Sequence, residues 1–116
     1  MDLAPRRQGN AVILSPEGRI DHSNAVALQS ALEPFLLECK PGGPRLVLDF
    51  SRLNYISSAG LRILMIAAKQ VKSQQGIIAV AAMQPVVREI FDISKFTFVL
   101  NCFDTVDEAL AQCPDQ

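Results

Sequence analysis

The chain has 116 residues, of which 49% are hydrophobic and 20% charged, and its formal net charge is −1. A chain of this size and composition can bury a core of its own without disulfides or a structural metal, so we expect one globular domain. Lysines and arginines are scattered along the sequence rather than gathered in a basic stripe, which excludes nucleic acid as an expected partner.

Membrane insertion and export are not expected. The longest apolar run, residues 77–83, is far shorter than the roughly 20 residues that cross a bilayer. The first five residues lack the charged-then-apolar layout of a signal peptide. The three cysteines, Cys39, Cys102 and Cys113, are odd in number and lack the spacing of metal ligands. We therefore expect a cytoplasmic protein with reduced thiols, no metal and no other cofactor.

Strand and helix patterns alternate along the chain. This alternation predicts an α/β fold in which helices cover a mainly parallel or mixed sheet. The expected order is β-β-α-β-α-β-α-β-α. Strands are predicted at residues 3–8, 11–14 (resuming at 19–20), 45–50, 77–82 and 97–100, and helices at about 24–39, 58–74, 85–91 and 105–112.

The stretch that connects the strand at 45–50 to the second helix carries the main candidate site. Two hydroxyl side chains, Ser57 and Ser58, are followed by the two smallest residue types, Ala59 and Gly60. A serine at a helix start accepts a hydrogen bond from a first-turn amide, and the partial positive charge there suits a phosphate. Gly60 costs about 1 kcal/mol inside a helix, and we expect it to keep this turn bare for a partner. Ser58 is then a phosphorylation switch; an ordinary pair of capping serines is the alternative.

A second polar cluster, Asp21, His22 and Ser23, precedes the first helix. Asp21 either caps that helix or lies beside the Ser58 turn, because loops at the carboxyl ends of strands gather at one edge of an α/β sheet. The single histidine and the lack of a Gly-x-Ser-x-Gly elbow argue against a serine hydrolase. A small enzyme that uses Ser58 or Asp21 is a further alternative, but the sequence offers no evident general base for it.

Two other charged residues, Asp49 and Arg62, lie near Ser58 in the sequence. Asp49 ends a strand, as a phosphoacceptor aspartate does in receiver domains, but the sequence lacks the acidic cluster and the late lysine that such a site needs. Arg62 follows one turn after Ser58 and is expected to be solvated or to face a partner.

Four blocks of the sequence carry a resemblance to a known family. The chain resembles the STAS domain of bacterial anti-sigma factor antagonists over about residues 9–112. The blocks are GRID at 18–21, LVLDFS at 46–51, YISSAGLR at 55–62 and VVREIFD at 86–92. The resemblance implies a single STAS domain spanning 1–116, with a four- to five-stranded mixed sheet and helices mainly on one side.

The resemblance also implies a function. Members of this family bind, in their unphosphorylated form, an anti-sigma factor that is also a serine kinase, and phosphorylation ends the binding. The phosphoacceptor falls on Ser58, and Ser57 stands where an acidic residue often precedes it. A non-enzymatic, monomeric binding module reset by a serine phosphatase is expected; an accessory subunit of a transporter or another signalling complex, not controlled by phosphorylation, is the alternative. The expected partner-binding residues are Asp21, His22, Ser23, Ser57, Ser58, Ala59, Gly60 and Arg62.

Overall fold

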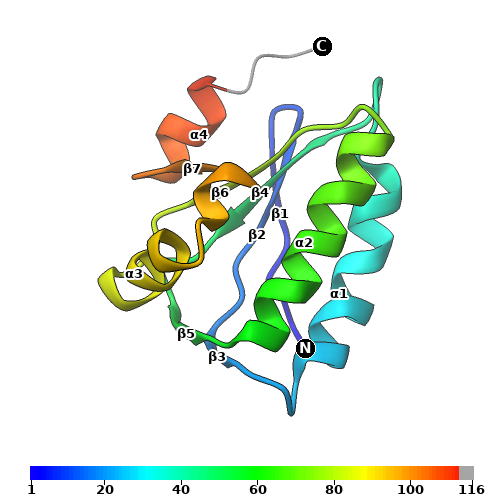
Figure 1. The fold of residues 1–116 in the computed structure, drawn as a ribbon. Coiled ribbons are helices and arrows are strands. Elements are labelled where there is room, and N and C mark those ends of the chain that lie inside the picture. Colours follow the sequence, from blue (N-terminus) through cyan, green and yellow to red (C-terminus); the bar gives the residue numbers. More distant parts are fainter. Residues whose placement is uncertain (113–116) are drawn as a thin grey trace.

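A computed structural model of the chain describes residues 1–112, the side chain of residue 112 excepted. Within these residues a five-stranded sheet with the strand order β1-β2-β4-β6-β7 is covered by helices (Figure 1). Strand β1 is antiparallel to β2, and the other neighbouring strands are parallel. The strands are β1 (Arg6–Gln8), β2 (Ala11–Leu14), β4 (Arg45–Asp49), β6 (Ile78–Ala81) and β7 (Asn101–Phe103); the helices are α1 (Ala25–Glu38), α2 (Ser58–Ser73), α3 (Pro85–Ile93), the short 3₁₀ helix η1 (Phe96–Phe98) and α4 (Val106–Gln112).

Both faces of the central strands are buried, and the helices divide between them. Alternate residues of β2, such as Val12 and Leu14, pack in the main core with α1, α2 and α3. The residue between them, Ile13, packs on the other face with Ala109 of α4. This alternation follows from the two-residue period of a strand. The mixed sheet with helices mainly on one side is thus confirmed.

Helices α1 and α2 lie side by side on the larger face (Figure 1). Leu28, Leu32 and Leu36 recur every fourth residue of α1 and are all buried, as the period of a helix requires. The C-terminal ends of the two helices are joined by Gln74, whose Nε2 donates to the Leu36 carbonyl at 2.8 Å and to the Cys39 carbonyl at 2.9 Å. The Leu36 carbonyl lies in the last turn of α1 and also accepts a bond from the Cys39 amide at 3.1 Å. Gln74 therefore adds bonds at a helix end, where carbonyls lack their regular helical partners.

The predicted strand at residues 97–100 is wrong. Phe96–Phe98 form η1 instead, and the strand in this region is β7, which begins at Asn101. The Phe96 ring packs edge-on against Phe91 of α3, with 5.2 Å between ring centroids. Burying Phe96 in this way turns Phe98 out, and its side chain is 87% exposed. Core packing overrides the strand preference of these aromatic and β-branched residues.

Two short strands outside the main sheet were not predicted as a pair. Residues 19–20 do not continue β2; they belong to β3 (Gly18–Ile20), which pairs in parallel with β5 (Leu53–Ile56). The chain reaches β3 through Gly18, whose φ of +84° favours glycine. The β3–β5 pair lies beneath the N-terminal end of α2 (Figure 1).

The thiols behave as ordinary packing groups. Cys39 is buried and Cys102 half-buried, both are free, and burial raises the pKa of each thiol. Cys113 lies outside the described residues. No helix within residues 1–112 has the length and apolar character needed to cross a membrane.

Gly60 holds the start of α2 close to the β3–β5 pair. Gly60 is buried, and a Cβ atom at this position would lie 2.6 Å from Ile20 Cγ2 and 2.7 Å from Ile56 Cγ1. The expectation that Gly60 keeps the first turn open for a partner is therefore wrong. The glycine is required because two buried isoleucines occupy the space of a side chain.

We expect Gly60→Ala to lower the free energy of unfolding by up to about 2 kcal/mol. Overpacking a core costs about 1–3 kcal/mol, which exceeds the gain of about 1 kcal/mol from replacing a helical glycine by alanine. Urea denaturation measures the change, with the exposed Ser58→Ala variant as a control expected to stay within about 0.5 kcal/mol. Stabilisation by Gly60→Ala would contradict the packing argument.

Candidate functional site

The candidate site lies where β3 and β5 end and α2 begins. Ile20 and Ile56, the last residues of the two strands, are paired, and the Ser57 amide donates to the Ile20 carbonyl at 2.8 Å. Asp21 directly follows Ile20, just as Ser57 follows Ile56. The parallel pairing therefore brings the Asp21–Ser23 segment to the edge occupied by the serines, as expected for loops at the carboxyl ends of strands.

The two serines have different roles in the structure. Ser57 is the N-cap residue of α2, and its Oγ accepts a hydrogen bond from the Gly60 amide at 3.3 Å. Ser58 is the first residue of the helix, and its side chain is exposed. Within residues 1–112 no hydrogen bond engages the Ser58 hydroxyl. The capping alternative thus holds for Ser57, whereas the Ser58 hydroxyl is left accessible.

The helix start offers a positive electrostatic environment to this hydroxyl. The amide of Leu61 donates to the Ser57 carbonyl at 2.9 Å, as the first regular bond of the helix. The amides of Ser58 and Ala59 come before it and have no acceptor among the described residues. The first turn of α2 contains no acidic residue, so the partial positive charge of the helix terminus is not neutralised locally.

Asp21 is fixed within its own loop and does not cap α1. Its Oδ1 accepts hydrogen bonds from the Ser23 amide at 3.0 Å and from the Ser23 hydroxyl at 2.5 Å. These bonds, first the hydroxyl and then the amide, lower the pKa of Asp21 below its ordinary value. The N-cap position of α1 is held by Asn24, whose side chain bonds to the Asp21 amide and the Arg19 carbonyl rather than to α1. The capping role considered for Asp21 is therefore wrong.

Arg19 and Tyr55 border the site and were missed by sequence reasoning. They are paired across β3 and β5, and the Arg19 Cζ atom lies 4.5 Å from the centroid of the Tyr55 ring, in cation–π geometry. The Arg19 Nε is also 3.8 Å from Asp21 Oδ2. The sequence patterns did not predict a strand at residues 53–56. Without that strand, nothing indicated that Tyr55 pairs with Arg19.

The remaining predicted residues differ in position. His22 and Ser23 are exposed on the β3–α1 loop, and Arg62 is exposed one turn into α2. Ala59 is half-buried, and Gly60 lies beneath the surface. No group of His, Cys, Asp or Glu side chains within the described part of the chain could hold a metal ion. The arrangement presents an exposed hydroxyl at the start of a helix whose first turn contains no acidic residue.

Asp49 does not belong to this site. Its carboxylate is 3.6 Å from Arg6 and accepts a hydrogen bond from the Ser51 amide at 3.0 Å. These contacts tie β4 to β1 and to the following turn. They give Asp49 a structural partner on each oxygen.

Comparison with known proteins gives consistent results. The family model of the STAS domain matches residues 2–109. The chain is 34% identical over 111 residues to the "Putative anti-sigma factor antagonist BtrV" of Bordetella bronchiseptica, covering 96% of this chain and 93% of that protein.

Three solved structures illustrate the shared fold. An anti-sigma factor antagonist from Mycobacterium paratuberculosis has a TM-score of 0.82 at 25% identity, covering 93% of this chain and 89% of that one. The antagonist SpoIIAA in its unphosphorylated form has a TM-score of 0.72 at 17% identity, covering 93% and 92%. Its phosphorylated form, from Bacillus, has a TM-score of 0.66 at 16% identity, covering 93% and 96%. The chain belongs to the STAS domain family.

Proposed function

We propose that this protein is an anti-sigma factor antagonist that is switched by phosphorylation of Ser58. In its unphosphorylated form it binds an anti-sigma factor with serine kinase activity, and the phosphate ends the binding. The observation that carries this proposal is the exposed Ser58 hydroxyl at the first position of α2, with the capping role taken by Ser57. The 34% identity to BtrV supports the antagonist role, and the phosphorylated form of SpoIIAA supports the modification.

The helix start explains how the free domain can accommodate a phosphate. The modification adds a charge of about −1.5 to −2 and three acceptor oxygens. The amides of Ser58 and Ala59 are available as donors, and the terminus favours an anion. An interface built around a hydroxyl must instead desolvate this charge. If the phosphate is about 1–3 kcal/mol less stable in the complex than in the free domain, the affinity for the partner changes about 5- to 150-fold. No refolding is needed.

The proposed partner surface consists of the two loops that meet at the helix start. It comprises Asp21, His22, Ser23, Ser57, Ser58, Ala59 and Arg62, with Gly60 supporting it from beneath. The kinase supplies ATP and Mg²⁺, and a serine phosphatase restores the active form. The protein itself acts as a monomeric binding module in the cytoplasm rather than as an enzyme.

We expect the two serines to separate stability from modification. Ser58→Ala abolishes phosphorylation and leaves stability nearly unchanged, because its hydroxyl makes no bond within the described fold. Ser57→Ala remains a kinase substrate but loses about 1 kcal/mol of stability, the usual cost of removing a cap. Mass spectrometry after incubation with ATP and the serine kinase encoded beside the gene locates the phosphate, and urea denaturation measures stability.

The reverse pattern, with phosphate on Ser57, would contradict the assignment. Stable binding of the kinase without any phosphorylation would favour the accessory-subunit alternative. A third variant, Ser58→Asp, places a carboxylate at the acceptor position. We expect it to bind the kinase more weakly than Ser58→Ala does; equal affinities would argue against a switch that depends on charge.

Asp21 contributes a carboxylate beside the acceptor in a chain where Ser57 replaces the usual acidic residue. Ser23 lowers the pKa of Asp21 below its ordinary value, so this carboxylate stays ionised at a more acidic pH than an ordinary aspartate does. We expect Ser23→Ala to raise the pKa of Asp21 toward its ordinary value of 3.8, measured by NMR titration of the carboxyl carbon. Ser30→Ala, on the exposed face of α1, is the control and should leave that pKa unchanged.

The sign of the associated stability effect is fixed. A pKa that is lower in the folded state than in the unfolded state means that the Asp21–Ser23 interaction stabilises the fold above the ordinary pKa. This contribution is lost as the pH falls through the lowered pKa. The difference in stability between wild type and Ser23→Ala should therefore shrink in acid; a difference that grows as the pH falls would contradict the assignment.

A further inference from the structure

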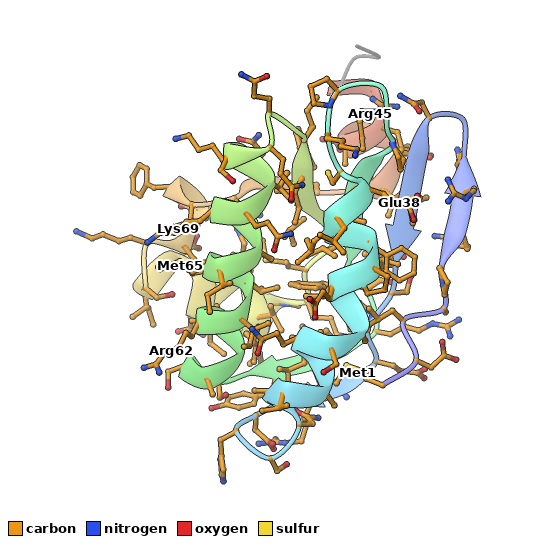
Figure 2. All side chains as sticks on the ribbon, turned by 90° about the vertical axis from the view of Figure 1, so that its right-hand side faces the viewer. Met1, Glu38, Arg45, Arg62, Met65 and Lys69 are labelled. Carbon is orange, nitrogen blue, oxygen red and sulfur yellow. The ribbon has the colours of Figure 1, made fainter. Side chains whose placement is uncertain are left out.

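A stripe of exposed residues continues from Ser58 along the outward face of α2. Arg62, Met65, Lys69 and Lys72 follow Ser58 at alternating spacings of four and three residues, which places them on one side of the helix. All four are exposed, and Met65 retains 37% of its accessible surface. Figure 2 shows Arg62, Met65 and Lys69 along the edge of α2 that faces away from α1. We call Arg62, Met65, Lys69 and Lys72 the α2 stripe.

The α2 stripe is positively charged and unpaired. Helix α2 contains these three cations and no Asp or Glu. Within residues 1–112 none of the three forms an ion pair. By contrast, Arg6, Arg7, Arg19 and Arg88 each lie 3.6–3.8 Å from a carboxylate. A concentration of one sign of charge on a chain of net charge −1 creates a local field that favours an acidic partner.

A groove adjoins the C-terminal half of the α2 stripe. It has a volume of about 390 Å³ and lies between α2 and the segment that joins η1 to β7. Ala68 and Lys72 form its wall on α2, and Val99, which is 37% exposed, and Asn101 form the opposite wall. None of its lining residues is acidic. The other side of α2 lies against α1 (Figure 1), and Gln74 bonds to the C-terminal end of α1.

We propose that the α2 stripe and this groove dock an acidic amphipathic helix of the kinase partner. Its apolar side contacts Met65 and enters the groove beside Val99, while carboxylates flank it and face Arg62, Lys69 and Lys72. The inference rests on the proposed function, because Ser58 lies on the same face and makes the docking surface continuous with the phosphorylation site. Together, Ser58 and the α2 stripe extend about 21 Å along the helix axis at 1.5 Å per residue, which is enough for roughly four turns of a partner helix.

The stripe also explains how one phosphate can oppose binding. Arg62 lies four residues after Ser58, at the spacing where side chains of opposite charge meet on a helix. A phosphate on Ser58 engages Arg62 and reduces the three positive charges of the stripe to a net charge of about +1. The acidic helix then meets a surface that attracts it less and that carries an anion of its own.

The experiment compares two matched double variants. Lys69→Glu with Lys72→Glu reverses two charges of the α2 stripe. Lys40→Glu with Lys95→Glu makes the same formal change at exposed lysines elsewhere, which also have no ion pair within the described residues. Calorimetric titration with the unphosphorylated kinase, without ATP, should show at least about a 10-fold loss of affinity for the first pair and less than about 2-fold for the second. Equal losses would overturn the proposal.

Two further measurements separate this proposal from the proposed function. Met65→Ser should weaken binding of the kinase without altering the melting temperature of the protein. Unchanged affinity would contradict the proposed apolar contact with Met65. A displayed library of helical peptides, selected on the wild-type protein alone and then measured for binding to the Lys69→Glu, Lys72→Glu variant, gives a test that does not use the kinase. Enrichment of acidic amphipathic sequences supports the surface even if the kinase does not bind; enrichment of peptides that bind both proteins equally overturns it.

Discussion

The close approach of α2 to the β3–β5 pair is the constraint on which the site depends. Ile20 and Ile56 are paired at the ends of their strands, and Gly60 leaves room for both side chains. The Ser57 amide bonds to the Ile20 carbonyl at the same point. These contacts fix the direction in which α2 leaves the strand. A helix start displaced by even one residue would turn Ser58 by about 100° around the helix axis, away from the Asp21 loop.

The fixed helix start divides two tasks between adjacent hydroxyls. An N-cap residue must direct its oxygen back toward the first-turn amides, and Ser57 does so through Gly60. Ser58, the next residue, does not cap the helix, and its side chain is exposed on the first turn. A phosphate on Ser57 would alter the oxygen that accepts from the Gly60 amide, whereas a phosphate on Ser58 leaves this hydrogen bond intact. The position of the free hydroxyl is therefore set by backbone geometry as much as by side-chain type.

Much of the fold could be predicted from local patterns. The continuous apolar strands, the helix start at Pro85 and the cap of α4, where Thr105 Oγ1 accepts from the Glu108 amide at 3.0 Å, all carry short-range signals. The parts that could not be predicted depend on contacts between distant residues. Nothing local indicates that Gly60 faces Ile20, or that packing of Phe96 on Phe91 prevents a strand at residues 97–100. The candidate site residues were predicted from a motif, but the packing reason for Gly60 required the structure.

The unpaired cations of α2 are a property of the surface rather than of the fold. Exposed ion pairs contribute only about 0–1 kcal/mol, so leaving Arg62 and Lys69 without partners costs the domain little stability. Lys72 even interacts favourably with the C-terminal end of the helix dipole, since it lies in the last turn. Selection on stability alone thus neither requires nor opposes the absence of acidic residues from this helix. The charge on its outward face can vary independently of the core that holds Ser58 in place, so a change of partner need not disturb the position of Ser58.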